Sequence, residues 1–306
     1  MPPHTPAPAG SFPSAWVGLV DDAAIFPPGD APLAQAYEAH LARRSQWYAD
    51  LVGPLVVRDT DLGSIEPGPP LAIVLTTGAG GIVPALSLAQ RKGHVVAGIE
   101  TAVRDVDDPA GNVRRIGAAL DAAEGEGLLE DDVLVHVEIP ADDEPHALGR
   151  VPYPMPASWL AAADEVAALG RRLKFRTGGP DASFVPSPER LAAQISASLD
   201  RETPFKCTAG LHRGVRHETD DPQGGWQHGF LNVVLATLAA WDGADPRTVQ
   251  LVLGEQDASV LARDAQAHAD DLDRARRWFT SFGSCSIDEP LADLIDLDLV
   301  HLGGTL

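Results

Sequence analysis

Two lysines stand inside short apolar segments that have the composition of β-strands. The chain has 23 Lys plus Arg but only three lysines, of which Lys174 lies in LKFRT and Lys206 in PFKCT. Because side chains alternate along a strand, Lys174 shares one face with Arg176, and Lys206 shares one face with Thr208. The apolar residues between them suit the opposite face. We therefore expect two neighbouring strands that place both lysines on the same side of a sheet.

A pair of buried lysines can carry out chemistry that arginine cannot. Burial and mutual repulsion both lower the pKa of a lysine, and a lysine that loses its proton near neutral pH is a nucleophile. Arginine stays protonated under the same conditions. The two lysines therefore predict imine formation with a carbonyl compound. The competing interpretation is that both bind an anion as point charges.

Short apolar runs alternate with amphipathic segments along the chain. The expected strands are 16–20, 54–58, 71–77, 94–100, 133–139, 173–177, 204–208 and 279–285, and 248–256 competes for the last place. Helical periodicity is clearest in 31–51, 111–125 and 188–200. Alternating strands and helices imply a parallel sheet, and eight strands of this kind predict a closed (β/α)8 TIM-type barrel. An open doubly wound parallel sheet is the fallback.

The barrel is expected to be a single domain over residues 15–306, preceded by a disordered tail at 1–14. Two long loops, 140–158 and 212–229, interrupt the alternation of strands and helices. Loops of this length in a compact domain often carry function. The second loop is rich in histidine, glycine and charge, and a helical segment at 230–243 follows it.

Polar residues collect where the expected strands end. In a parallel barrel all strands end at one face, where the following loops build the site. Glu100 and Glu138 are the carboxylates at such ends that could move protons. Other polar residues at or near strand ends are candidates for substrate binding, namely Asp22, Arg58, Arg176, Thr177, Thr208, Ser284 and Ser286.

The segment around Lys174 resembles the class I, Schiff-base aldolases of the deoxyribose-phosphate aldolase type. In that family the Schiff-base lysine lies on the sixth strand of a (β/α)8 barrel, in a K-T-S-T-G-like motif. Lys174, Thr177 and Gly178 match its lysine, last threonine and glycine. The resemblance implies a lyase of the aldolase class that needs neither a cofactor nor a metal.

Two further segments resemble the same family. Lys206 and Gly210 match a K-x-x-G-G-like motif of the seventh strand, with Ala209 in place of the first glycine. Gly283–Ser286 is similar to the family's G-x-S-S-like phosphate loop. The resemblance covers residues 173–212 and 282–286, and the first half of the chain shows none.

The resemblance implies a set of roles. Lys174 forms the imine, Lys206 lowers its pKa, and Glu138 or Glu100 takes the place of the family's proton-relay aspartate. The substrate is then a small phosphorylated or carboxylated carbonyl compound. Gly178, Gly179, Gly210 and His212 join the substrate-binding residues Arg176, Thr177, Thr208, Asp22, Arg58, Ser284 and Ser286.

Two other functions stay open at this stage. The first is a metal-assisted hydrolase or enolate-type lyase, with Asp59, Glu100, Glu138 and one of His212, His217 or His228 as ligands. The second is a non-catalytic barrel that binds a sugar phosphate. Loss of activity on chelation, and binding without turnover, would separate them from the aldolase hypothesis.

The composition limits the partners and the compartment. A net charge of −21 and a pI of about 4.7 disfavour nucleic acid and anionic membranes as partners. Two cysteines suit a reducing compartment, and no apolar run is long enough for a transmembrane helix. We expect a cytoplasmic protein that binds a small anionic carbonyl compound and forms a possible homo-oligomer.

Overall fold

The computed structural model describes residues 12–140, 155–219 and 225–301. The strands are β1 (Val20–Asp22), β2 (Val52–Arg58), β3 (Leu71–Val74), β4 (Val96–Ala102), β5 (Leu134–Glu138), β6 (Arg172–Arg176), β7 (Phe205–Thr208), β8 (His217–Thr219), β9 (Gly225–Gln227) and β10 (Phe279–Ser284). The α-helices are α1 (Leu33–Arg43), α2 (Ile82–Lys92), α3 (Pro109–Gly125), α4 (Ala157–Ala168), α5 (Pro188–Leu199), α6 (Phe230–Trp241), α7 (Pro246–Gly254), α8 (Ala258–Ala267), α9 (Leu272–Arg276) and α10 (Asp288–Asp296).

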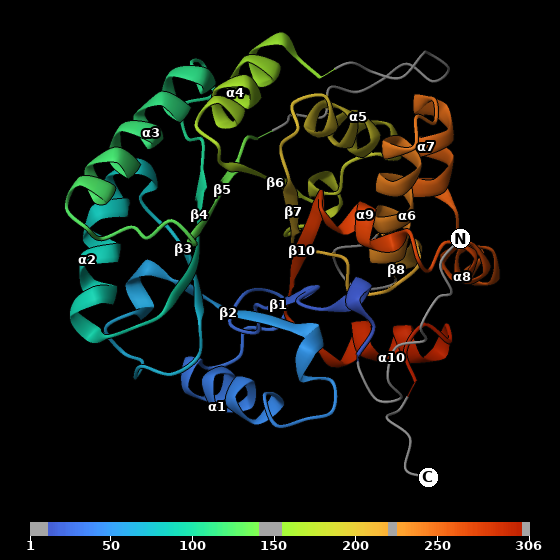
Figure 1. Ribbon diagram of the computed structural model, residues 1–306, viewed down its shortest axis with the longest axis horizontal. Coiled ribbons are helices and arrows are strands. Elements are labelled where there is room, and N and C mark those ends of the chain that lie inside the picture. Colours follow the sequence, from blue (N-terminus) through green and yellow to red (C-terminus); the bar gives the residue numbers. More distant parts are fainter. Residues whose placement is uncertain (1–11, 141–154, 220–224, 302–306) are drawn as a thin grey trace, which may run out of the picture.

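Eight strands close into a parallel barrel. Their order is β1-β2-β3-β4-β5-β6-β7-β10, with β10 pairing with β1 to close the ring. Figure 1 shows these strands at the centre, with α1 to α4 around one side and α5 to α10 around the other. The predicted (β/α)8 barrel is confirmed, and the open-sheet fallback is wrong because β1 pairs with both β2 and β10.

The two lysine strands lie side by side with the expected faces. Lys174 is the register partner of Lys206 across β6 and β7. The apolar residues that alternate with the lysines along each strand face the helices, where the Phe175 ring stacks on the Phe205 ring with centroids 4.6 Å apart. Each fully buried phenylalanine contributes about 1.5–3 kcal/mol of hydrophobic free energy. Apolar packing outside the barrel thus directs the charged side chains into it.

The expected first strand and the competing segment for the last strand differ most from the structure. The first strand is Val20–Asp22 rather than 16–20, because Gly18 adopts a left-handed φ of 60° and Ser14–Trp16 form a 3-10 turn. The competing segment 248–256 lies mostly in helix α7, where the Asp245 side chain caps the N-terminus and Pro246 occupies the first turn. The eighth barrel strand is therefore β10, as the main prediction had it.

The long loops and the tail are partly described. Residues 1–11 and 141–154 lie outside the described residues, so most of the expected tail and of the 140–158 loop are untested. At the end of the expected tail, the centroid of the Phe12 ring lies 6.3 Å from that of the Trp47 ring. The 212–229 loop contains the antiparallel hairpin of β8 and β9, which the sequence did not predict.

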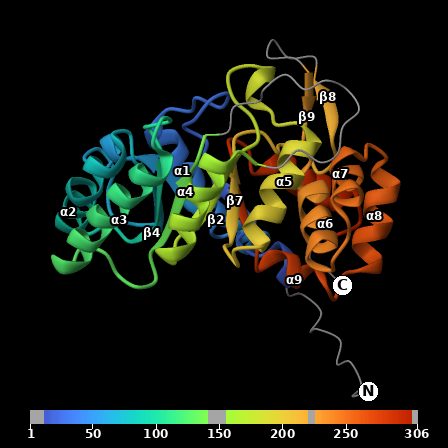
Figure 2. The same ribbon diagram turned by 90° about the horizontal axis from the view of Figure 1, so that it is seen from above.

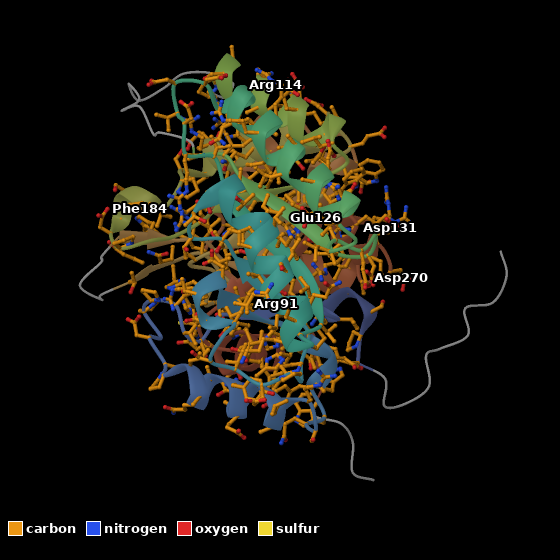
Figure 3. The ribbon with its side chains drawn as sticks, turned by 90° about the vertical axis from the view of Figure 1, so that its left-hand side faces the viewer. Arg91, Arg114, Glu126, Asp131, Phe184 and Asp270 are labelled. Carbon is orange, nitrogen blue, oxygen red and sulfur yellow. The ribbon has the colours of Figure 1, made fainter. Side chains whose placement is uncertain are left out.

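The outer faces of α2 and α3 carry exposed charged residues. Figure 3 shows Arg91 on α2 and Arg114 on α3 pointing away from the barrel, and both are exposed. No helix in the described part of the chain is long and apolar enough to cross a membrane.

Candidate active site

Glu100 lies between the two predicted lysines inside the barrel. Lys174 Nζ lies 2.8 Å from Glu100 Oε2, and Lys206 Nζ lies 2.5 Å from Glu100 Oε1. All three side chains are buried. One carboxylate on β4 therefore pairs with both ammonium groups and fixes their positions.

Asp21 on β1 holds Lys206 from the opposite side. Asp21 Oδ2 lies 2.5 Å from Lys206 Nζ and accepts a hydrogen bond of 2.9 Å from the Ser281 hydroxyl. Gly53 leaves room for this carboxylate, because a Cβ at that position would clash with Asp21 Oδ1. Lys206 is thus enclosed between two buried carboxylates.

Glu138 on β5 holds Lys174 from its other side. Glu138 Oε2 lies 3.3 Å from Lys174 Nζ. Arg176 binds both oxygens of the same carboxylate, with Nε 2.7 Å from Oε1 and Nη2 3.3 Å from Oε2. Binding through two arginine nitrogens fixes the orientation of the Glu138 carboxylate as well as its charge. Together these pairs form a chain of ions of alternating sign that runs from β1 to β6 through the barrel.

The two glutamates are held in their ionised form. Burial alone raises the pKa of Glu100, but the charges of Lys174 and Lys206 outweigh burial and lower it well below its usual range. Burial likewise opposes ionisation of Glu138, and the charges of Lys174 and Arg176 lower its pKa. Both glutamates are therefore ionised at neutral pH.

Lys206 is held in its protonated form. Burial alone lowers the pKa of Lys206, but the carboxylates of Asp21 and Glu100 raise it above its ordinary value. Burial also raises the pKa of Asp21, which Lys206 only partly offsets. The predicted lowering of lysine pKa values by mutual repulsion is thus wrong for Lys206, because carboxylates separate the two ammonium groups.

His136 lies on β5 next to Glu100 in register and is buried. Burial and the charge of Lys206 lower the pKa of His136 well below its ordinary value, so the ring is neutral at neutral pH. Its Nε2 atom is buried and has no hydrogen-bond partner among the described residues. Buried polar atoms without a protein partner are commonly bound to water.

A cavity of about 670 Å³ opens above this ionic chain. Its walls come mainly from the segments that follow β1, β6, β7 and β10, and a cavity of this size is typical of small-molecule sites. Lys174 and Glu100 line the cavity, whereas Lys206 does not. A ligand in the cavity therefore reaches Lys174 but not Lys206.

The loops after β6 and β7 touch at two glycines in the cavity wall. A Cβ on Gly178 would lie 2.8 Å from Gly210 N, and one on Gly210 would lie 2.7 Å from the Thr177 carbonyl oxygen. Gly210 has a φ of 72°, and its neighbours Ala209 and Leu211 have φ of 60° and 55°. For a residue with a side chain this conformation costs about 1–2 kcal/mol. Strain of this kind is concentrated at binding sites.

The same turn carries two backbone N–H groups in the cavity wall. The N–H groups of Gly178 and Gly210 find no backbone acceptor among the described residues. Ser286, in the loop after β10, adds a hydroxyl to the cavity wall. Turns with free N–H groups bind anions. We therefore name this surface, formed by Gly178, Gly210 and Ser286, the glycine turn site.

At the rim of the cavity near β10, His212 lies within hydrogen-bond reach of Glu289 and Cys285. His212 Nδ1 lies 3.1 Å from Glu289 Oε2, and Cys285 Sγ lies 3.8 Å from the same nitrogen. Burial and the charge of Glu289 raise the pKa of Cys285 to about 11. The thiol therefore stays protonated at neutral pH.

Seven of the predicted substrate-binding residues line the cavity, namely Arg176, Gly178, Gly179, Thr208, Gly210, His212 and Ser286. The predicted site is therefore assembled largely from the segments after β6, β7 and β10.

Two predicted substrate-binding residues point elsewhere. Asp22 follows Asp21 in β1 and so faces the opposite side, where it binds His40 Nδ1 at 3.0 Å and Arg43 Nη1 at 2.9 Å on α1. The Arg58 guanidinium lies 4.6 Å from the centroid of the Phe26 ring and is not in the cavity wall.

Thr177 and Ser284 shape loops instead of lining the cavity. The Thr177 hydroxyl donates a hydrogen bond of 2.6 Å to the Ala209 carbonyl oxygen, joining the loops after β6 and β7. Ser284 Oγ accepts a hydrogen bond of 3.2 Å from Ser286 N. Both act on the shape of the glycine turn site.

The ligand set of the metal-assisted alternative is not brought together. Asp59 Oδ1 accepts a hydrogen bond of 2.7 Å from Thr76 at the surface, and His228 Nε2 is 2.7 Å from the Pro186 carbonyl oxygen. No group of three His, Cys, Asp or Glu side chains in the described ranges is placed to hold a metal ion.

Three residues of the ionic chain and its surroundings were missed as site residues. They are Asp21, Ser281 and His136, all buried in the barrel interior. The expected first strand ended at residue 20, so Asp21 fell outside it and was not among the predicted site residues. A first strand that begins at Val20 would have included Asp21 and placed its side chain inside the barrel.

The site is that of a (β/α)8 barrel with a buried, lysine-containing ionic chain beneath its cavity. No family model matches the sequence, and no curated protein matches it. Among solved structures, the crystal structure of the HMG-CoA lyase from Brucella melitensis is similar, with a TM-score of 0.40 and 12% identity over 85% of this chain and 95% of that chain. This similarity assigns no role to the residues around the cavity.

Proposed function

We propose that the protein is a lyase that forms an imine between Lys174 and a small carbonyl substrate bearing a phosphate or a carboxylate. The observation that carries the proposal is that Lys174 is a buried lysine that lines the cavity, with Glu100 Oε2 2.8 Å from its amine. A nucleophilic amine and a carboxylate within hydrogen-bond reach are the parts that imine formation needs.

The proton balance of imine formation fits this pair. The Lys174 ammonium transfers one proton by way of Glu100 to the carbonyl oxygen, and the freed amine attacks the carbonyl carbon. A second proton from the same nitrogen then lets the oxygen leave as water, which yields a protonated imine. The imine draws electrons from the adjacent C–C bond, and a carboxylate takes the proton of the hydroxyl whose carbon departs.

Lys206 serves the site by holding Glu100. When Lys174 becomes neutral, the Lys206 ammonium stays paired with the Glu100 carboxylate, because Asp21 and Glu100 keep Lys206 protonated. Glu100 therefore remains oriented through the reaction. This role replaces the predicted one, in which Lys206 acts on Lys174 by repulsion.

The glycine turn site supports an anionic substrate. The N–H groups of Gly178 and Gly210, which donate to no backbone acceptor among the described residues, and the Ser286 hydroxyl suit the oxygens of a phosphate or carboxylate. The segments that follow the last two barrel strands are a frequent phosphate site in this fold.

Borohydride trapping tests the proposal directly. The wild-type protein is incubated with a panel of aldehydes and keto acids, reduced, digested and examined by mass spectrometry. A stable adduct on Lys174, with Lys92 unmodified as internal control, is the expected result. Absence of any adduct on Lys174 across the panel would contradict the lyase and favour a non-catalytic binding barrel.

A further inference from the structure

The β8–β9 hairpin lies over the cavity and has two distinct faces. Figure 2 shows it at the edge of the molecule beyond α5 and α6. Its register pairs His217 with Gln227, Glu218 with Trp226, and Thr219 with Gly225. Residues directly opposite in an antiparallel pair share a face, and successive residues alternate between faces.

One face of the hairpin belongs to the cavity wall. His217, Thr219 and Gln227 all line the cavity, whereas Glu218 and Trp226 do not. The charged and the aromatic side chain thus point away from the cavity, and the neutral polar side chains point into it. We call His217, Thr219, Gly225 and Gln227 the inner face.

Contacts at its root hold the hairpin in place. The Arg216 backbone N–H donates a hydrogen bond of 2.8 Å to Asn232 Oδ1, and the Arg216 guanidinium lies 5.3 Å from the Trp226 ring centroid. His228 Nε2 lies 2.7 Å from the Pro186 carbonyl oxygen. Groups positioned in advance by such contacts bind ligands at a lower entropic cost.

The inner face is suited to an uncharged hydrogen-bonding group. His217 Nδ1 lies 3.1 Å from the Val215 carbonyl oxygen, which can only accept, so the neutral ring carries its proton on Nδ1. Nε2 is then an acceptor. The Gln227 amide offers both donors and an acceptor, and its Oε1 lies 3.5 Å from a Cβ placed on Gly210. No Lys, Arg, Asp or Glu stands on the described inner face.

We propose that His217 and Gln227 are specificity-determining residues that bind a hydroxyl or amide group of the substrate, away from its reacting carbonyl. The hydroxyl or amide donates to His217 Nε2 and accepts from the Gln227 amide. The glycine turn site holds the anionic group separately. This inference rests on the proposed function for the identity of Lys174 as the reacting residue.

Rates of borohydride trapping on Lys174 test the inference with three aldehydes of equal chain length. They are butanal, succinic semialdehyde and the amide of succinic semialdehyde. Wild type is expected to react with the amide about tenfold faster than with butanal, as two added hydrogen bonds allow. Gln227→Leu and His217→Ala should each reduce this preference to about threefold or less. Succinic semialdehyde, which carries the anion, shows whether the loss in each variant is specific to the uncharged group.

Glu218→Gln on the outer face is the matched control and should keep the wild-type preference. An unchanged preference in both inner-face variants, or an equal loss in Glu218→Gln, overturns the inference.

A second measurement separates this inference from the proposed function. Saturation-transfer NMR with butanamide needs no imine. If no aldehyde labels Lys174, the lyase proposal fails, but a butanamide signal that is present in wild type and lost in Gln227→Leu still supports the inner face. A wild-type signal that is absent, or equal in the variant, overturns it.

Discussion

Lys174 and Lys206 face each other across β6 and β7, and each binds a different oxygen of the one carboxylate of Glu100. The lysines are thus linked through an anion. Their environments still differ, since Lys174 lines the cavity and Lys206 lies deeper, against Asp21. One lysine is available for covalent chemistry, and the other is part of its support.

Lys206→Met is expected to destabilise the fold by about 3–5 kcal/mol, because it leaves Asp21 and Glu100 buried without their cation. Urea unfolding followed by circular dichroism measures the change. Lys92→Met at the surface is the control and should lie within about 0.5 kcal/mol of wild type. A Lys206→Met protein as stable as wild type would show that this cation is not needed by the two carboxylates.

Glu100→Gln is expected to slow adduct formation on Lys174 by about 100-fold or more, since the amide cannot carry the proton. Lys174→Arg should abolish the adduct. The check is the initial rate of borohydride trapping at saturating aldehyde, with Glu126→Gln on the exposed surface as control. Equal rates for Glu100→Gln and wild type would move the proton transfer to another group.

The lowered pKa of Glu138 makes the fold sensitive to acid. The unfolded chain binds a proton near the ordinary value of 4.5, whereas the folded chain binds it only at lower pH. Its contribution to stability is therefore complete above 4.5 and is lost as the pH falls through the folded pKa.

Unfolding free energies of wild type and Glu138→Gln, measured from neutral pH down into acid, should therefore converge as the pH falls. Asp131→Asn, at an exposed position, serves as control and should run parallel to wild type. Parallel curves for Glu138→Gln would refute the assignment.

Ala209→Gly is expected to stabilise the protein, although Ala→Gly changes usually destabilise. The left-handed φ of 60° at Ala209 costs about 1–2 kcal/mol, which exceeds the 0.5–1 kcal/mol or so that glycine costs through unfolded-chain flexibility. Ala118→Gly on the exposed face of α3 should lower stability by about 1 kcal/mol. Thermal unfolding of the two variants should therefore show shifts of opposite sign.

Gly178→Ala is expected to weaken anion binding, because its Cβ would lie 2.8 Å from Gly210 N within the glycine turn site. Inorganic phosphate should slow trapping on Lys174 in wild type and do so much less in this variant. Gly80→Ala has open space around its Cβ and is the control. Equal inhibition by phosphate in all three proteins would place the anion elsewhere.

The sequence by itself determined the barrel and the direction of its lysines. Alternation of apolar runs and amphipathic segments requires a parallel sheet covered by helices, and the period of two along LKFRT and PFKCT requires both lysines on one face. These are local properties, since each depends on a few consecutive residues. For the same reason, boundaries were less well predicted, and a first strand placed too early left Asp21 out of the site while Asp22 was included.

Only the tertiary structure decided which charges meet. Lys206 and Asp21 are 185 residues apart in the chain, and closure of the barrel between β1 and β10 brings them together. The pKa of a buried group depends on all charges within a few ångströms. The two lysines alone predicted a lowered pKa for Lys206, whereas the neighbouring carboxylates raise it. Closure of the barrel likewise left Lys174 in the cavity wall and covered Lys206. The matching sequence motifs around the two lysines do not predict this difference.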